Sequence, residues 1–330
     1  MHVRPLPPGP LAFIGDVHGE LSALEALDRQ LDGRHRVYVG DLIDRGPDSP
    51  GVVRMVGEQI QSGLATAILG NHELNLLRGL PKNDNRWFRG EDQLFDGEVM
   101  PQAKATPAER KGIIDLMASL PLAAEREDVR AVHASWGPID EIRNANESVP
   151  LLFDRFERQI MEGLQADGLM SDPSWRRRWR RLLNHDDEPE LDVEMQEKEY
   201  RIQNGNPVKW LTSGPEGKRS ALHWISGRWR QLERLPWWRI YRDDPAVVMG
   251  HYWRVMPPVG RRQLMEDGKF AGAAPNQALG PRQNVFCIDY SVGKRFLDRL
   301  RDRPYTGRLA ALLWPEKQLV FDDGEVMSTR

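Results

Sequence analysis

The sequence has almost no cysteine, since Cys287 is the single one. One cysteine excludes an internal disulfide and is typical of proteins in a reducing compartment. Long apolar runs are also missing, and none approaches the roughly 20 residues that a membrane-spanning helix needs. The N-terminal stretch "MHVRPLPPGP" holds four prolines and no apolar core, unlike a signal peptide. These absences predict a cytoplasmic protein with no membrane partner.

A strong excess of charge of either sign is missing too. Lysine and arginine number 46 and aspartate and glutamate 49, which gives a formal net charge of −3 at pH 7. This balance predicts no general attraction to nucleic acid or acidic membranes. Hydrophobic residues make up 40% of the 330 residues, so the chain can bury the core of one large domain or two modest ones.

Short apolar runs rich in branched residues alternate with helical patterns. Eight runs are typical of buried strands, at residues 11–16, 36–41, 65–71, 129–134, 246–251, 284–290, 309–314 and 317–322. Apolar residues recur at helical spacing within 21–31 and 113–120. Strands alternating with helices predict an α/β layered domain.

The stretch from about 137 to 240 has a different character. A basic run, "WRRRWRR", is followed by an acidic one, and tryptophans are frequent at 175, 179, 210, 224, 229, 237 and 238. Neither flank alone supplies a full sheet, so we interpret 137–240 as an insertion within a single domain of residues 1–330. Its tryptophans and arginines are typical of a surface that binds nucleic acid or phosphate, but also of a small hydrophobic core. The acidic run that follows favours the small core. A lid over the functional site is a third interpretation.

Polar residues follow five of the apolar runs. They occur in "GDVHG" (15–19), "GDLIDRG" (40–46), "GNHE" (70–73), "VHAS" (132–135) and "GHYW" (250–253). Because ligands collect beyond the carboxyl ends of strands in α/β sheets, we expect these tips to converge. The candidates are Asp16, His18, Asp41, Asp44, Arg45, Asn71, His72, His133 and His251. Such a mixed nitrogen and oxygen set suits Mn, Fe or Zn better than calcium.

Hydrolysis of a phosphate ester needs such a set. Two cations roughly 3.5–4 Å apart neutralise the phosphate and lower the pKa of a bound water, and one carboxylate must bridge them. An arginine can clamp phosphate oxygens with its planar fork. A histidine that is not a ligand can protonate the leaving alkoxide, held in place by a carboxylate. Alone, His133 or His251 is equally typical of a satisfied core histidine. A structural ion pair is the less favoured interpretation of Asp44 with Arg45.

"GDVHG", "GDLIDRG" and "GNHE" together resemble the three signature blocks of the calcineurin-like metallophosphoesterases. The "DRG" is most similar to the branch of serine/threonine protein phosphatases, symmetrical diadenosine tetraphosphatases and the phosphatase domain of bacterial polynucleotide kinase-phosphatase. The resemblance implies two facing mixed β-sheets flanked by helices, with a largely helical insertion. It also implies two divalent metal ions, Mn²⁺ first, with Fe, Zn or Ni as alternatives.

Carried over by position, the resemblance implies that Asp16 and His18 bind a first metal ion and that Asp41 bridges the two ions. It implies that the second ion is bound by Asn71, His133 and His251. His72 becomes the general acid, oriented by Asp44, and Arg45 binds phosphate. Glu73 either supports these residues or begins a helix.

The chain departs from the family pattern at three places. Two residues after His133, where the family has glycine, this chain has Ser135 and then Trp136. Tyr252 stands where threonine is frequent, and "DYS" (289–291) replaces "DTG". Each puts a bulkier residue near the expected pocket, so the departures bear on the substrate. We expect Tyr252 and Arg254 to contact it, together with Arg45.

The resemblance implies a hydrolase that uses a metal-bound hydroxide. The first expectation is a phosphomonoesterase acting on phosphoprotein or a small phosphorylated metabolite. A symmetrical dinucleoside polyphosphate hydrolase, with a nucleotide substrate, is the alternative. A nucleic-acid end-processing phosphatase is a further alternative that the charge does not favour. The intact ligand set argues against a non-enzymatic scaffold.

Overall fold

The computed structural model describes residues 1–330 without 96, 170–173, 187, 226–227, 257–267 and 271, and without the side chains of 175, 176 and 225. The side chain of Trp175, in the basic run, therefore lies outside the described ones. Within the described part of the chain, no helix is both long and apolar enough to cross a membrane.

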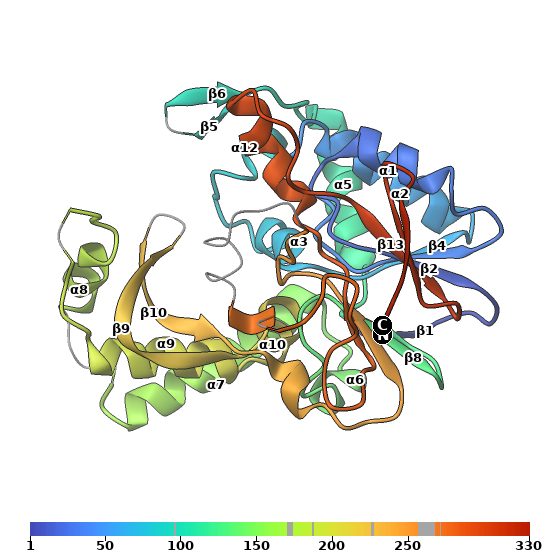
Figure 1. Cartoon of the computed structure of the whole chain (residues 1–330). Coiled ribbons are helices and arrows are strands. Elements are labelled where there is room, and N and C mark those ends of the chain that lie inside the picture. Colours follow the sequence, from blue (N-terminus) through green and yellow to red (C-terminus); the bar gives the residue numbers. More distant parts are fainter. Residues whose placement is uncertain (96, 170–173, 187, 226–227, 257–267, 271) are drawn as a thin grey trace.

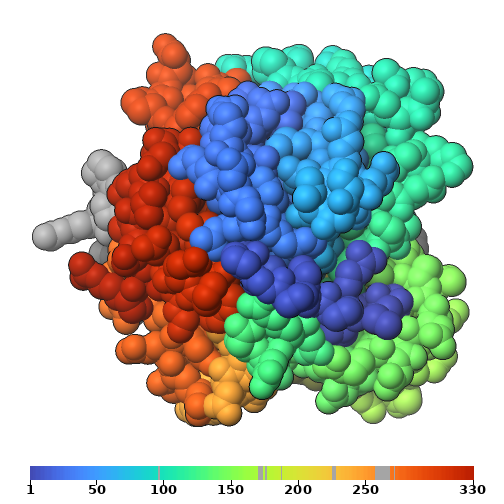
Figure 2. Space-filling model, turned by 90° about the vertical axis from the view of Figure 1, so that its right-hand side faces the viewer, coloured from blue at the N-terminus to red at the C-terminus, as the bar shows by residue number. Residues whose placement is uncertain are grey.

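A six-stranded sheet forms one layer of the molecule. Its order is β15, β14, β13, β2, β3, β4, which are Val326–Ser328, Gln318–Phe321, Ala310–Trp314, Leu11–Ile14, His35–Tyr38 and Ala65–Ala67. β2, β3 and β4 are parallel, whereas β13 runs antiparallel to β2 with Ala311 opposite Ile14. The last strands of the chain thus complete a sheet that the first ones begin, and Figure 2 shows the C-terminal segment in red directly beside the N-terminal part in blue.

A five-stranded sheet forms the second layer. Its order is β1, β7, β8, β11, β12, which are Val3–Pro5, Ala123–Glu125, Val129–Val132, Ala246–Met249 and Val285–Cys287. β8 pairs antiparallel with β7 and parallel with β11, so this sheet is mixed as well. β8 and β11 are neighbours in the sheet although more than a hundred residues separate them in the sequence.

The two sheets face each other across one apolar layer. Phe13, Val37 and Leu312 of the first sheet and Val248 and Phe286 of the second belong to the same buried cluster. Helices cover the outer faces: α1 (Leu21–Asp28), α2 (Ser49–Gln61), α3 (Asn71–Leu77) and α5 (Pro107–Ser119). This architecture confirms the predicted α/β fold, and each of the eight predicted strand runs overlaps a strand.

Shorter elements lie along the sequence between the strands of the two sheets. They are α4 (Arg86–Arg89), β5 (Gln93–Phe95), β6 (Glu98–Met100), η2 (Gly268–Phe270), η3 (Val292–Lys294) and α12 (Arg295–Leu300). α5 begins at a capping box, because Thr106 and Glu109 exchange hydrogen bonds with each other's backbone N–H groups.

The insertion lies in sequence between β8 and β11. It contains α6 (Asp140–Arg143), α7 (Val149–Ala166), α8 (Trp175–Arg181), α9 (Val193–Asn204), α10 (Pro207–Ser213), β9 (Glu216–Ile225), β10 (Arg228–Arg234) and η1 (Trp237–Ile240). Figure 1 shows α7, α8, α9 and the antiparallel pair β9 and β10 projecting to one side of the sheets. The strand pair was not predicted, since the sequence favoured helices here.

The described tryptophans of the insertion have packing roles. Trp179 and Trp229 pack around Leu182 and Met195 in a small cluster inside the insertion. Trp237 and Trp238 are 5% and 2% exposed and belong to the main core. These contacts agree with a core and give no support to an exposed stacking surface.

Candidate metal centre

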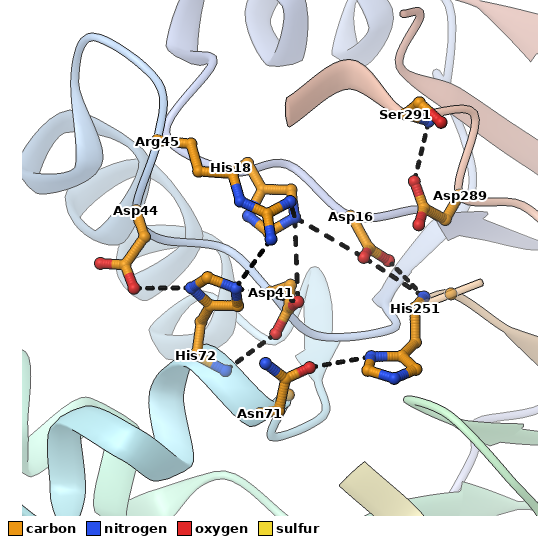
Figure 3. Close-up of polar contacts among 12 residues, drawn as sticks. Asp16, His18, Asp41, Asp44, Arg45, Asn71, His72, His251, Asp289 and Ser291 are labelled. Atoms are coloured by element: carbon orange, nitrogen blue, oxygen red, sulfur yellow. Dashed lines mark hydrogen bonds and ion pairs between the residues drawn. The ribbon is translucent and has the colours of Figure 1, made fainter. Parts of the chain in front are cut away.

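The polar residues at the strand ends meet in one buried region, as the sequence predicts (Figure 3). They follow β2, β3, β4, β8 and β11: Asp16, His18, Asp41, Asp44, Asn71, His72, His133 and His251. All of them except the half-buried Asn71 are buried. Buried polar groups need partners, so this concentration requires hydrogen bonds, ions or both.

One set of donor atoms surrounds the amide oxygen of Asn71. This Oδ1 lies 3.1 Å from His133 Nε2 and 2.8 Å from His251 Nδ1, and His133 Nε2 is 3.4 Å from Asp41 Oδ1. Adjacent ligands of an ion with bonds of 2.0–2.1 Å are about 3 Å apart. His133 Nδ1 donates to the Val39 carbonyl at 2.8 Å, which directs its Nε2 lone pair inward. These four side chains therefore fit one metal ion.

A second set shares Asp41 with the first. His18 Nε2 lies 3.8 Å from Asp16 Oδ2 and 3.8 Å from Asp41 Oδ2. His18 Nδ1 donates to the Ile43 carbonyl at 3.2 Å, so its Nε2 also faces the centre. Asp41 thus presents Oδ1 to one set and Oδ2 to the other, the arrangement required of a bridging carboxylate.

The electrostatics of this region favour cations. Burial and the nearby charge of Asp289 raise the pKa of Asp16 well above its ordinary value. Burial alone would lower the pKa of His133, but the charge of Asp41 outweighs it and raises this pKa to about 10. Metal binding to such a histidine releases the proton. The residues present therefore fit two divalent ions.

The backbone around the centre is strained. Left-handed φ angles occur at His18 (47°), Asp41 (49°), Asp44 (75°), Arg45 (68°) and His251 (66°). Such angles are unfavourable for non-glycine residues and persist where surrounding structure holds them, frequently at functional sites. The adjoining glycines leave no room for a side chain: a Cβ on residue 250 would lie 1.9 Å from the Asp16 carboxylate.

His72 lies beside both donor sets, but its ring is held by Asp44 on the side away from them. Its Nδ1 is 2.6 Å from Asp44 Oδ2, and Trp87 Nε1 donates to Asp44 Oδ1 at 2.6 Å. Burial lowers the pKa of His72, but the charge of Asp41 and the hydrogen bond to Asp44 outweigh it, so the pKa is raised. His72 Nε2 faces the centre, 3.9 Å from Asp41 Oδ2.

Arg45 points into the centre and does not pair with Asp44. Its Nη1 donates to His18 Nε2 at 2.9 Å, and its Nη2 is 3.3 Å from His72 Nε2 (Figure 3). The guanidinium therefore stands between His18, of the second donor set, and His72.

Glu73, which was expected to support the site or begin a helix, and Trp87, which was not expected, hold the site in shape. Glu73, fully buried, accepts hydrogen bonds from the backbone N–H groups of Asp41, Leu42 and Gly70 at 2.8–2.9 Å. Burial and the charge of Asp41 raise the pKa of Glu73 to about 7. Trp87 fixes Asp44 from 43 positions further along the chain. Nothing in the sequence signals Trp87, because its indole N–H becomes relevant only through the fold.

The structure places Tyr252 and Arg254 differently from the expectation of substrate contacts. Tyr252 is fully buried against Trp238. Arg254 is 4% exposed and donates to the carbonyls of Ala274 and Gln277 at 2.5 and 2.8 Å. Both side chains are occupied in packing. Trp253, between them, is the half-buried residue that faces Arg45.

The fold and the two donor sets are those of a metal-dependent phosphoesterase. The sequence model of the calcineurin-like phosphoesterase family matches residues 9–214. The chain belongs to this family and is a phosphoester-cleaving hydrolase.

Several curated proteins are similar to this chain. A symmetrical bis(5'-nucleosyl)-tetraphosphatase of Aeromonas hydrophila is 26% identical over 270 residues, which cover 76% of this chain and 86% of that protein. One of Ralstonia nicotianae is 42% identical over 78 residues, 23% of this chain and 26% of that protein. Serine/threonine-protein phosphatase 2 of Escherichia coli is 36% identical over 98 residues, 28% of this chain and 43% of that protein. This chain thus spans about a quarter of the Ralstonia protein and less than half of the Escherichia protein.

Proposed function

We propose that this chain hydrolyses dinucleoside polyphosphates at a two-metal centre. The observation that carries the proposal is the alignment with the Aeromonas tetraphosphatase, which extends over most of both chains. The match to the Escherichia phosphatase is confined to 28% of this chain. The comparisons therefore support this alternative better than the phosphomonoesterase that was the first expectation.

Six side chains hold the two ions in this proposal. Asp16 and His18 take the first, Asp41 bridges, and Asn71, His133 and His251 take the second. The spacing of the donor atoms and the shared carboxylate support this division. When bound, Mn²⁺ or a similar ion neutralises phosphoryl oxygens and lowers the pKa of water.

Arg45 and His72 act on the substrate. The fork of Arg45 binds two oxygens of the phosphoryl group, for which its position between His18 and His72 is suited. His72 carries a proton at Nε2 to the leaving oxygen, while Asp44 holds Nδ1 and thereby the orientation of the ring. Trp87 keeps Asp44 in place.

The reaction is the addition of one water to the central anhydride of a dinucleoside tetraphosphate. One phosphorus–oxygen bond breaks, one forms, and two nucleoside diphosphates result. The leaving group is a phosphate oxygen, which needs less protonation than an alkoxide. His72 therefore contributes less to this substrate than to an alkyl phosphate.

The insertion (137–240) selects the substrate in this proposal. Its final strand reaches the centre, because Arg234 Nη1 donates to the His251 carbonyl at 3.2 Å. Its first residues are packed against α10, where a Cβ on residue 137 would lie 2.0 Å from Trp210 Nε1. A segment whose final strand contacts the His251 backbone borders the path of a long substrate.

A phosphomonoesterase acting on phosphoprotein is the second candidate. The match to the Escherichia phosphatase, 36% identical over 98 residues, supports it. A nucleic-acid substrate has less support, since the net charge is −3 and four tryptophans of the insertion, Trp179, Trp229, Trp237 and Trp238, belong to buried clusters.

A substrate panel separates these functions. The protein is incubated with Mn²⁺ and, separately, with diadenosine tetraphosphate, nitrophenyl phosphate, a phosphopeptide and a 3'-phosphorylated oligonucleotide. The products are separated by ion-exchange chromatography. We expect the highest kcat/KM for diadenosine tetraphosphate, with ADP as the single product. ATP with AMP would contradict symmetrical cleavage, and a preference for the phosphopeptide would establish the second candidate.

A further inference from the structure

Trp253 lies at the edge of the metal centre, two residues after His251. Its ring is approached by two cations: the guanidinium carbon of Arg45 is 4.9 Å from the ring centroid, and Lys294 Nζ is 5.5 Å from it. Contacts of this kind attract a cation to the π face. Arg45 follows β3 and Lys294 lies in η3, so the indole collects two positive charges from distant segments.

Neither cation is neutralised by a carboxylate ion pair within the described part of the chain. Arg45 instead faces the imidazoles of His18 and His72. Nearby basic residues behave differently: Arg299, in α12, pairs with Glu20 at 2.5 Å. Two like charges held against one ring without an ion-pair partner among the described residues favour an anion that carries more than one charge.

The position of Lys294 is fixed by close packing. A Cβ on residue 293 would lie 2.5 Å from the His18 ring and 3.1 Å from Arg45 Nη1, so the backbone of η3 touches the centre. Ser291 has a left-handed φ of 62° and donates its N–H to Asp289 at 2.8 Å. Its hydroxyl bonds the Arg254 carbonyl at 3.1 Å, which ties η3 to the loop that carries Trp253.

We propose that Trp253 and Lys294 form a second phosphate subsite beside Arg45. Arg45 takes the phosphoryl group being hydrolysed, and the Lys294 ammonium, a compact point charge, takes the next group along the chain. Trp253 positions both cations. The inference rests on the proposed function, because a polyphosphate supplies the second anion and a phosphomonoester does not. The subsite thereby selects for the substrate class.

Inhibition of nitrophenyl phosphate hydrolysis tests the subsite. Phosphate and pyrophosphate are compared as competitive inhibitors, with Mn²⁺ in excess over both. In Lys294→Met the inhibition constant for pyrophosphate should rise about tenfold or more, the loss expected for one charge-assisted hydrogen bond, while that for phosphate changes by less than about twofold. Lys294→Arg should restore pyrophosphate binding.

The chain offers a matched control. Lys317 Nζ lies 5.4 Å from the Trp314 ring, at the end of β13 that pairs with the start of β2, away from the strand tips. Lys317→Met removes an equivalent lysine–tryptophan contact and should leave both inhibition constants unchanged. Equal weakening of phosphate and pyrophosphate in Lys294→Met, or no weakening of either, would overturn the subsite.

Trp253 is tested in the same assay. Trp253→Ala should weaken both inhibitors, since it removes the ring beneath Arg45 as well as Lys294, whereas Trp253→Phe should retain most of the binding. Unchanged inhibition in Trp253→Ala would overturn the positioning role. Thermal unfolding of each variant shows that it is folded. The assay does not use a dinucleotide, so a failure of the subsite is distinguishable from a failure of the proposed function.

Discussion

The carboxylate of Glu73 holds the backbone N–H of Asp41 at 2.9 Å, and its neighbouring bonds hold Leu42 and Gly70. One buried side chain thus locks together the two loops that carry Asp41 and Asn71. Asp41 has a left-handed φ of 49°, unfavourable for a non-glycine residue, and this contact is one of those that hold it.

Glu73→Ala should therefore destabilise the protein and loosen the metal centre. Several buried N–H groups would lose their acceptor, and each unsatisfied group costs about 1–3 kcal/mol. We expect the free energy of unfolding in urea to fall by at least about 3 kcal/mol, with reduced metal content. Glu109→Ala, which removes an exposed carboxylate that also accepts a backbone N–H, is the control and should change far less. If Glu73→Ala and Glu109→Ala lower the free energy of unfolding by the same amount, Glu73 is an ordinary helix cap.

Dialysis against a chelator should abolish hydrolysis of nitrophenyl phosphate, and Mn²⁺ should restore it. Mn²⁺ should not restore activity to the Asp41→Asn variant, because Asp41 faces both donor sets. Metal analysis of the purified variant should show loss of both ions. Asp28→Asn, which alters a carboxylate paired with Arg36 at 2.9 Å, should keep the wild-type content. Full activity in the chelated wild-type protein would refute a metal-dependent reaction.

His72→Asn should keep both ions and lose turnover. General acids contribute about 10²- to 10⁴-fold, so kcat should fall by at least about a hundredfold for an alkyl phosphate. The loss should be smaller for nitrophenyl phosphate, whose leaving group is less basic. Since His72 Nε2 is only 3.9 Å from Asp41 Oδ2, metal analysis is the decisive measurement. A variant that lacks one ion would identify His72 as a ligand.

The pH dependence of stability should differ between the metal-free and metal-loaded protein. The pKa of His133 rises from 6.5 to about 10 on folding, so the folded chain binds this proton more tightly than the unfolded one. Its contribution to stability is complete below pH 6.5 and is lost as the pH rises toward 10. Urea unfolding with a chelator present should show this decline.

Mn²⁺ affinity should rise over the same interval, because the proton competes with the ion. His133→Asn should flatten the decline in the chelated protein. An unchanged slope in this variant would assign the pH dependence to other groups.

Replacement of the whole insertion by a flexible linker should unfold the protein. Val208 and Leu211 of α10 are fully buried in the main core, and Trp237 Nε1 donates to the Ala134 carbonyl beside His133. A glycine–serine stretch of equal length in place of 174–191 removes only α8 and part of the small cluster. Hydrolysis of nitrophenyl phosphate should then stay within about tenfold, because the metal site supplies the chemistry. A folded, active protein without residues 137–240 would contradict this division.

The local sequence pattern is sufficient to predict the strands and the polar residues that follow them. Alternation of apolar runs with helical spacing predicts the layers, and polar residues after a run mark its end. The pair β9 and β10 was missed because charged side chains interrupt the apolar alternation in residues 216–234. Trp253 was missed in favour of its neighbours, since the left-handed turn at His251 breaks the alternation that would predict which side chain faces inward. Trp87 is found only when the chain is folded.

The pairing of β2 with β13 has a consequence for synthesis. β2, at Leu11–Ile14, gains its antiparallel neighbour only when Ala310–Trp314 is made, and the Asp16 carboxylate meets the backbone of His251 across 235 positions. Contacts of such high sequence separation slow folding, because a long loop must close before they form. A nascent chain therefore leaves one edge of an apolar strand unpaired for most of its translation, and unpaired edges of this kind favour aggregation of incomplete chains.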